Sequence, residues 1–344
     1  MVAAIIKELS LQRDYLHNEE VNTLYFGGGT PSLLDNEDLA AILHQVYDLY
    51  NVTPGAEVTL EANPDDLSYS KLKELKESRV NRLSIGVQTF DEQVLELLNR
   101  AHTRLQGEEC LALARQLGFD NISLDLIYGI PGRGEAQWVE DLERALHHRP
   151  GHISTYSLTI EPKTVFGRRQ ARGKFPAIDE EQAAHQFELM LDILGKAGYE
   201  QYEISNFCLP GYYSRHNSSY WKQQEYLGIG PSAHSYDGKS RQFNISNNGK
   251  YMKSIAAGVV PYDREVLEKK DKVNEYLLTT LRTKWGTDLA RLKDEFDVNL
   301  LEERAPYIRN LLDSKLAKIT NQHLGLTNKG KLLADKISSD LFID

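Results

Sequence analysis

The sequence has few cysteines, and their scarcity excludes several classes of protein. Only Cys110 and Cys208 occur in 344 residues, so a disulfide framework is excluded and a reducing cytoplasm is the expected location. Two cysteines also cannot supply the three or four thiolates of a cysteine-ligated metal cluster. No uninterrupted apolar run approaches the ~20 residues that span a bilayer, and the N-terminal segment lacks the small-residue cleavage signal of a secretory leader.

Positive charge is also scarce. The chain has 40 lysines and arginines against 50 aspartates and glutamates, which gives a formal net charge of −10. Uniform acidity argues against a general nucleic-acid binder and against electrostatic attachment to an anionic membrane, although other peripheral membrane contact stays open. Hydrophobic residues at 41% and charged residues at 26% exclude wholesale disorder. At this length we expect one large domain or two moderate ones, and the sequence does not indicate an oligomeric state.

Short apolar runs alternate with helical patterns over residues 1–205, after an opening helix with apolar residues from Val2 to Leu16. This alternation predicts right-handed βαβ units and a parallel sheet. Because the runs are dense in apolar residues, we expect strands that are covered on both faces. The expected strands are 23–26, 58–62, 82–87, 122–128, 152–158 and 202–205, and the expected helices are 36–50, 69–78, 107–117, 135–147 and 179–197.

Two parallel architectures fit this pattern: a doubly wound open sheet, and a full or partial (β/α) barrel. Polar residues at or just after the ends of four expected strands help to choose between them, namely 27–30, Glu61, Gln88 and Asp125. In a barrel, such strand ends converge on one mouth. In an open sheet they spread along an edge. We therefore predict an α/β fold with a partial parallel barrel over 1–205, in which Glu61 and Asp125 lie at the same end.

The alternation stops after residue 205. An aromatic-rich connecting region is expected over 206–264, with many Asn, Ser, Gly and Tyr residues and few helix signals. From 265 to 344 the chain becomes helical and charged, with a hairpin expected at 318–327 and a final helix at 328–342. We predict a mainly helical C-terminal domain with a small β wing.

Three consecutive glycines and Thr30 follow the first expected strand. Such a loop lets a backbone approach a ligand closely, although a tight βα turn capped by Thr30 or Ser32 explains it equally well. The spacing matches neither a dinucleotide-binding fingerprint nor a phosphate-binding P-loop. Taken alone, the glycine run is therefore a weak functional signal.

Polar side chains inside apolar strands need partners. A buried carboxylate such as Glu61 must be paired or neutralised, either by a ligand at the barrel mouth or by Arg82 or Arg100. Gln88 has the same two interpretations, and Asp125 lies in an apolar run that makes a solvated role improbable. Matching positions in successive strands favour a common ligand site.

The segment 203–236 is rich in aromatic residues around two histidines, His216 and His234. His216-Asn217-x-x-Tyr220-Trp221 places an imidazole beside two flat rings. An imidazole nitrogen can ligate haem iron, and aromatic rings can stack on the macrocycle. An aromatic packing loop with hydrogen-bonded histidines is the simpler interpretation, and composition alone favours it.

The segments together resemble a known family. TLYFGGGTPSLL, LEANPDD, RLSIGVQTF, LDLIYGIPG, YEISNF, SRHNSSYW and YLGIGPSAHSY match, in order and spacing, the radical S-adenosylmethionine (SAM) proteins related to oxygen-independent coproporphyrinogen III oxidase. The resemblance covers essentially the whole chain. The HNxxYW segment is similar to the haem chaperone branch of this family rather than to the true oxidase. Cys208, where a small residue is expected, and Asn99, where glycine is common, depart from the pattern.

The resemblance implies two sets of site residues and a function. The residues implied for SAM are Gly28, Gly29 and Thr30 at its amino acid end, with Glu61, Gln88, Arg100 and Asp125 at further contacts. The residues implied for haem are His216, Asn217, Tyr220 and Trp221, with His216 as the candidate iron ligand. The leading hypothesis is a haem chaperone that passes haem to an acceptor protein. Radical decarboxylation of coproporphyrinogen III, and a remnant that binds neither ligand, are the alternatives.

The family's CxxxCxxC motif, which ligates three irons of a [4Fe–4S] cluster while SAM completes the fourth, does not occur in this sequence. We therefore expect these 344 residues to hold no such cluster and to bind SAM more weakly, whereas haem binding at His216 does not need the cluster. Three explanations fit the missing motif: a late start site, a shortened chain and a natural cluster-free relative. Loss of a front segment is favoured, because Gly28–Thr30 and Glu61 are retained.

Overall fold

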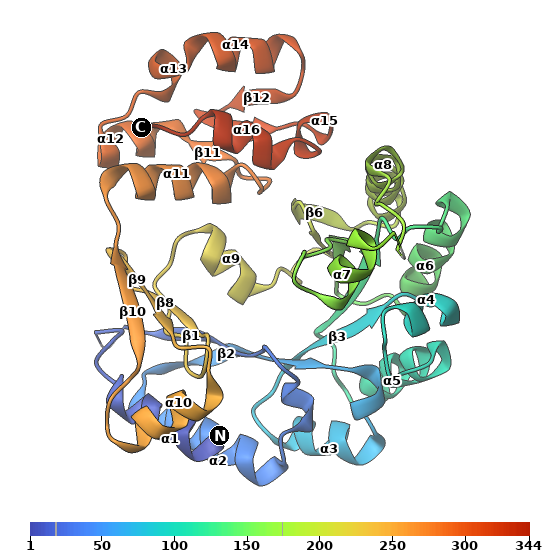
Figure 1. The fold of residues 1–344 in the computed structure, drawn as a ribbon, viewed down its shortest axis with the longest axis vertical. Coiled ribbons are helices and arrows are strands. Elements are labelled where there is room, and N and C mark those ends of the chain that lie inside the picture. Colours follow the sequence, from blue (N-terminus) through green and yellow to red (C-terminus); the bar gives the residue numbers. More distant parts are fainter. Residues whose placement is uncertain (18, 174) are drawn as a thin grey trace. The chain divides into compact units, whose positions relative to one another are not determined.

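The computed structural model describes residues 1–17, 19–173 and 175–344. Its chain divides into two compact units, coloured along the sequence in Figure 1. The first unit consists of Met1–Tyr25, Leu34–Glu57 and Arg215–Asp344, and the second consists of Phe26–Leu33 and Val58–Ser214. The domain boundaries at 205 and 264 stay a prediction.

The main sheet has seven strands in the order β1-β2-β3-β4-β5-β7-β6. The strands from β2 to β5 pair in parallel, and a helical segment follows each before the next begins. This topology confirms the partial parallel (β/α) barrel predicted from the sequence. The strands are β1 (Val21–Phe26), β2 (Val52–Ala62), β3 (Arg82–Gln88), β4 (Ile122–Tyr128), β5 (His152–Ser157), β6 (Glu200–Glu203) and β7 (Asn206–Cys208). The helical segments of the second unit are η1 (Pro31–Leu33), η2 (Pro64–Asp66), α3 (Tyr69–Glu77), α4 (Glu92–Leu97), α5 (Arg104–Gln116), α6 (Glu135–His148), α7 (Val165–Ala171) and α8 (Glu180–Lys196).

The last two strands of the sheet depart from the prediction. The strand expected at 202–205 ends at Glu203, and β7 returns antiparallel to both β6 and β5. Ser205 N and Asn206 Nδ2 both donate to Glu203 Oε2, at 2.9 and 2.6 Å. This carboxylate holds the tight turn that reverses the chain.

The two faces of β3 and β4 differ in polarity. Buried apolar side chains on one face are Leu83, Ile85 and Val87 of β3 and Ile122, Leu124 and Leu126 of β4. Helices cover that face, since a Cβ added to Gly107 of α5 would lie 3.5 Å from Val87 Cγ1. On the other face, Ser84 Oγ donates to Asp125 Oδ2 at 3.2 Å. The strands are covered on the outside by apolar packing, while their inner face is polar, which the apolar density of the sequence did not indicate.

The first unit contains two antiparallel three-stranded sheets, in the orders β10-β9-β8 and β11-β13-β12. Its helices are α1 (Val2–Leu11), α2 (Asn36–Leu49), α9 (Arg215–Trp221), α10 (Asn248–Ala256), α11 (Lys269–Thr280), α12 (Leu289–Phe296), α13 (Leu300–Glu303), α14 (Ala305–Asp313), α15 (Asn328–Lys331) and α16 (Ala334–Asp340). Its strands are β8 (His234–Tyr236), β9 (Ser240–Asn244), β10 (Tyr262–Val266), β11 (Thr287–Asp288), β12 (Ala317–Thr320) and β13 (His323–Leu326). In the part of the chain that the structure describes, no helix has the length and apolar character to cross a membrane.

Three expectations for this unit change in detail. The hairpin at 318–327 is confirmed as β12 and β13, with β11 as a third strand. The opening helix ends at Leu11, so Leu16 lies outside it. The final helix is divided into α15 and α16, because Leu333 (φ −114°, ψ 19°) leaves helical geometry. The region after 205 also contains more regular structure than its composition suggested, including α9 and the β10-β9-β8 sheet.

A buried carboxylate organises the first unit. Glu8 of α1 is 0% exposed. Its oxygens accept hydrogen bonds from four neutral donors: Gln12 Nε2 (3.0 Å), Asn244 Nδ2 (2.6 Å), Gly230 N (2.8 Å) and the Tyr251 hydroxyl (2.5 Å). These donors come from the residue after α1, from β9, from α10 and from the loop before β8, so one side chain links four segments of the unit.

Replacing Glu8 with alanine should destabilise the protein strongly. The substitution leaves four buried donors without an acceptor, and each unsatisfied donor costs about 1–3 kcal/mol. We expect a total loss of roughly 3–5 kcal/mol, the upper range for single substitutions. Urea unfolding followed by circular dichroism measures it, with the exposed Glu302→Ala as control. A loss as small as the control's would contradict the role assigned to Glu8.

Candidate functional site

The glycine loop after β1 contacts the end of β2. Gly28 (φ 72°) and Gly29 (φ 65°) adopt left-handed backbone conformations, and no atom of the described residues lies within 4 Å of an added Cβ. The requirement for glycine is therefore conformational rather than steric. Gly28 N donates to Glu61 Oε2 at 3.1 Å. The structure thus joins two of the residues singled out from the sequence, and Thr30 follows half-buried in the same loop.

Gly86 of β3 brings Gln88 and Arg100 together. A Cβ at Gly86 would lie 2.7 Å from Gln88 Nε2 and 3.2 Å from Arg100 Nη2, so a larger residue there would have to displace the ends of these side chains. Arg100 Nη2 donates to Gly86 O (2.9 Å) and to Asn63 Oδ1 (2.8 Å). Burial lowers the pKa of Arg100, and the nearby Asp65 and Asp125 carboxyls act in the opposite direction. Neither Gly86 nor Asn63 was identified from the sequence.

Asp125 lies in the middle of β4 rather than at its end, on the polar inner face. Ser84 Oγ and Ser123 Oγ donate to its two oxygens at 3.2 and 3.4 Å. Burial raises the pKa of Asp125 to about 6, and the neighbouring Glu61 carboxyl adds to this rise, although Ser154 and Arg82 oppose it. Glu61 of β2 pairs in register with Ser84 of β3, and Ser84 pairs with Ser123 of β4. Glu61 and Asp125 therefore lie on the same face of the sheet, with β3 between their strands. A carboxyl group with such a pKa changes its charge close to neutral pH.

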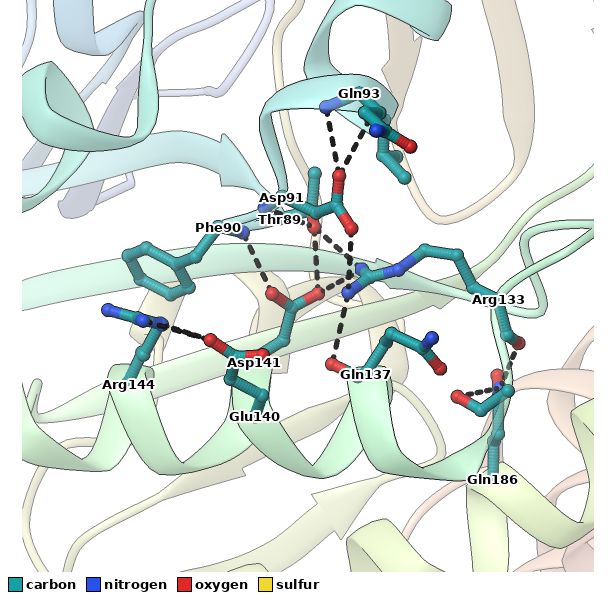
Figure 2. Close-up of polar contacts among 12 residues, drawn as sticks. Thr89, Phe90, Asp91, Gln93, Arg133, Gln137, Glu140, Asp141, Arg144 and Gln186 are labelled. Carbon is teal, nitrogen blue, oxygen red and sulfur yellow. Dashed lines mark hydrogen bonds and ion pairs between the residues drawn. The ribbon is translucent and has the colours of Figure 1, made fainter.

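A buried ion pair fixes the loop that directly follows Gln88, the last residue of β3. Figure 2 shows Asp141 of α6 between Arg133 and the loop after β3. Arg133 Nη1 donates to Asp141 Oδ2 at 2.6 Å, and Phe90 N donates to Asp141 Oδ1 at 2.8 Å. Thr89 Oγ1 also donates to Asp141, at 2.8 Å. These contacts fix the chain directly after Gln88, whose backbone is left-handed (φ 69°).

The candidate haem residues lie on α9 in the first unit. The backbone N–H groups of Arg215 and His216 donate to the two oxygens of the buried Glu57, at 3.0 Å each. Glu57 therefore fixes the start of α9. His216 and Tyr220 are four positions apart and share one side of the helix, and Asn217 and Trp221 form the next pair around it.

The environment of His216 comes partly from β1. The imidazole stacks on Tyr25, with ring centroids 4.6 Å apart and planes at 15°. Thr23 Oγ1 lies 2.9 Å from His216 Nδ1, and the Tyr220 hydroxyl lies 3.0 Å from Nε2. Tyr220 meets the imidazole edge-on rather than face to face. Sequence reasoning missed Thr23, Tyr25 and Glu57 as neighbours of His216, because they lie more than 150 positions from it and nothing local links them to α9.

Trp221 and the competing ligands occupy different surroundings. Trp221 Nε1 is buried without a hydrogen-bond partner among the described residues. His234 begins β8, is exposed and lies against Phe243. Cys208 is fully buried in β7 of the second unit. Of the three groups considered as iron ligands, His216 is the one set among aromatic rings on α9.

The residues present do not fit a [4Fe–4S] cluster. The two cysteines lie on α5 and β7 and are both buried, and burial raises the pKa of the Cys110 thiol to about 12. Among residues 1–17, 19–173 and 175–344, no three His, Cys, Asp or Glu side chains form a group able to hold a metal ion. The described residues therefore offer no set of thiolates for the cluster.

Comparison with known proteins defines the class. Residues 6–145 match the Radical SAM superfamily, and residues 267–333 match the HemN C-terminal domain. Among solved structures, coproporphyrinogen III oxidase (HemN) from Escherichia coli, described as a radical SAM enzyme, has a TM-score of 0.84. The match covers 99% of this chain and 82% of that chain at 21% identity, so it shows the fold alone. The fold is that of a radical SAM protein with a HemN-type C-terminal domain.

Curated relatives define the family more narrowly. "Heme chaperone HemW" of Lactococcus lactis subsp. lactis (strain IL1403) is 35% identical over 343 residues, which cover 100% of this chain and 90% of the relative. "Heme chaperone HemW" of Bacillus subtilis (strain 168) is 35% identical over 320 residues, with 92% and 84% covered. The chain belongs to the HemW family.

Removing the carboxylate of Asp141 should destabilise the second unit. Asp141→Ala removes the closer of two carboxylates that contact the buried guanidinium of Arg133, while the partly exposed Asp91 stays at 3.5 Å. We therefore expect a loss of about 3 kcal/mol, the lower end of the range for breaking a buried ion pair. Replacing both residues, as Arg133→Met with Asp141→Leu, should recover much of this loss, because no fully buried charge remains unpaired and Asp91 still caps α4. Urea unfolding of the single and double variants measures the effect. Equal losses in both would show that packing, not charge, dominates here.

The raised pKa of Asp125 predicts a pH-dependent stability. Because the folded protein holds this proton up to about pH 6 and the unfolded chain only to about 3.8, the contribution of Asp125 to stability falls as pH rises between those values. Asp125→Asn removes this loss. The urea midpoint of the variant should therefore rise relative to wild type between pH 4 and pH 7. The exposed Asp120→Asn is the matched control, and an identical pH profile in both variants would refute the assignment.

Proposed function

We propose that this protein is a haem chaperone, which binds haem through α9 and passes it to an acceptor protein. The relatives named heme chaperones at 35% identity over nearly the whole chain support this function. The structural observation that carries it is His216 of α9. Its imidazole stacks on Tyr25 of β1 and meets the ring of Tyr220 edge-on. Haem is here the transported molecule, so the protein must bind it reversibly.

The residues of α9 have distinct roles in this proposal. His216 supplies the axial nitrogen, and Tyr220 and Trp221 supply apolar ring surface beside it. Asn217, one residue on, offers an amide to polar parts of the haem edge. Glu57 holds the first turn of α9, so the position of His216 does not depend on bound haem. A cytoplasmic location is part of the proposal, since both cysteines are free thiols.

We further propose that the second unit binds S-adenosylmethionine. Gly28, Gly29 and Thr30 would meet its amino acid end, with Glu61, Gln88, Arg100 and Asp125 making the remaining contacts. The space that Gly86 leaves beneath Gln88 and Arg100 supports this proposal, as does the contact between Gly28 and Glu61. When bound, S-adenosylmethionine supplies a sulfonium that can be reductively cleaved. The residues present do not fit the cluster that donates the electron, so no radical step is derived for this chain.

The alternative of a coproporphyrinogen III oxidase-like enzyme has less support. The likeness to HemN is a likeness of fold at 21% identity, and it does not extend to substrate. We therefore propose haem transfer rather than decarboxylation as the activity.

The experiment that tests the haem site is titration of the 344-residue chain with hemin, followed at the Soret band. His216→Ala should weaken binding by about tenfold or more, since even outer-shell changes at metal sites cost 10–100-fold. Trp221→Ala should weaken it less, because it removes ring contact but no iron ligand. His234→Ala, Cys208→Ala and the exposed His44→Ala serve as comparisons. If His216→Ala binds hemin like wild type, the proposed site is wrong.

A further inference from the structure

Both ring nitrogens of His216 already face hydroxyl groups. Thr23 Oγ1 lies 2.9 Å from Nδ1, and the Tyr220 hydroxyl lies 3.0 Å from Nε2. Haem iron needs the lone pair of one of these nitrogens. The position that the iron would take is therefore next to a side chain of the protein, and that side chain must move.

The chemistry of the two hydroxyls indicates which nitrogen holds the proton. A neutral imidazole carries one N–H and one lone pair, and its hydrogen bonds decide where each lies. A phenol is a stronger acid than an aliphatic alcohol and is the better donor. A tyrosine hydroxyl also keeps its proton at neutral pH. Tyr220 thus donates to Nε2, and Nδ1–H donates to Thr23.

We infer that Tyr220 caps the iron-ligating nitrogen of His216 in the haem-free protein, and that Thr23 is a positioning residue that fixes the tautomer. The inference rests on the proposed function, because it assigns a state to the proposed haem ligand. Thr23 keeps the proton on Nδ1, which directs the lone pair of Nε2 toward the ligand side. Tyr220 covers that lone pair until haem displaces it. No covalent bond changes; one hydrogen bond is exchanged for an iron–nitrogen bond.

The surroundings allow Tyr220 to leave while His216 stays. Tyr220 is 38% exposed and is the next-to-last residue of α9, so its hydroxyl can turn away from Nε2 toward water while the ring stays beside the imidazole. His216 is held by its stack on Tyr25, by Thr23, and by the bond from its backbone N–H to Glu57. The ring of Tyr220 also meets Tyr226 edge-on, with centroids 4.8 Å apart. That contact favours the position in which the Tyr220 hydroxyl faces Nε2 of His216.

If Tyr220 caps Nε2, removal of the Tyr220 hydroxyl should make hemin binding faster. Tyr220→Phe keeps the ring and its contact with Tyr226 but frees Nε2. Hemin association, measured by stopped flow, should become roughly two- to tenfold faster, which corresponds to one neutral hydrogen bond. Tyr69→Phe, at an exposed tyrosine of α3, should leave the rate unchanged. An unchanged or slower rate in Tyr220→Phe overturns the cap.

The positioning role of Thr23 has its own readouts. Thr23→Val has nearly the same shape but no acceptor for Nδ1–H, and should lower hemin affinity by about tenfold. The Soret and electron paramagnetic resonance signals should shift with it, and Thr23→Ser should restore both. Nitrogen-15 spectra of the haem-free chain should show the His216 proton on Nδ1. A proton on Nε2, or failure of serine to restore the signals, overturns the role.

Failure of this inference can be told apart from failure of the proposed function. If His216→Ala abolishes hemin binding while Tyr220→Phe binds no faster, the cap is wrong and the haem site stands. If His216→Ala binds hemin normally, the site itself is wrong, and the cap falls with it. Circular dichroism of each variant confirms that the chain is folded. Tyr220→Phe is the decisive variant, because it is expected to gain rather than lose binding.

Discussion

Buried carboxylates determine much of this structure, because a charge removed from water must be met by donors of the protein. Glu8 accepts from four neutral groups in the first unit. Asp141 accepts from Thr89, the Phe90 amide and Arg133 in the second. Glu57 accepts from the first amides of α9. In each case the carboxylate accepts from residues far from it in the sequence, so one side chain fixes how distant segments meet.

Asp125 differs from these carboxylates in the groups that meet it. Serine hydroxyls on the polar inner face of the sheet donate to it, and the charge of Arg82 favours its ionised form. Burial raises its pKa to about 6. Asp125 shares the inner face of the sheet with Glu61, and it is the buried acid that we propose to meet a ligand. Glu8, Asp141 and Glu57 instead hold segments of the chain together.

The sequence predicted the elements of the sheet far better than the contacts around the sites. Strand and helix alternation is a local signal, and it placed the strands through residue 157 and the parallel topology correctly. The joining of Gly28 to Glu61 followed from strand ends that share an edge. Thr23 and Tyr25 were not predictable, because they lie in an ordinary apolar strand and become meaningful only when α9 folds beside it.

Glu8 and Gly86 were missed for a related reason. Glu8 lies in an amphipathic helix that looks like any surface helix, and its donors are scattered over residues 12–251. Gly86 lies in a strand, and the reason for a glycine there becomes clear only when the side chains of Gln88 and Arg100 are known to pack against it. The end of β6 was wrong because the turn depends on Glu203, whose hydrogen bonds are made with the two residues that follow the strand.

The short stretch from Thr23 to Gly28 has a consequence for protein engineering. Its first half contacts His216, and its last residue contacts Glu61, so six consecutive codons serve two proposed sites. Random substitution there mixes two phenotypes and cannot separate loss of one ligand from loss of the other. Variants that isolate a single function must instead be single designed substitutions, at Thr23 or on α9 for one proposed site and at Gly86 or Asp125 for the other. A library designed on that basis would give clean genetic separation of the two activities.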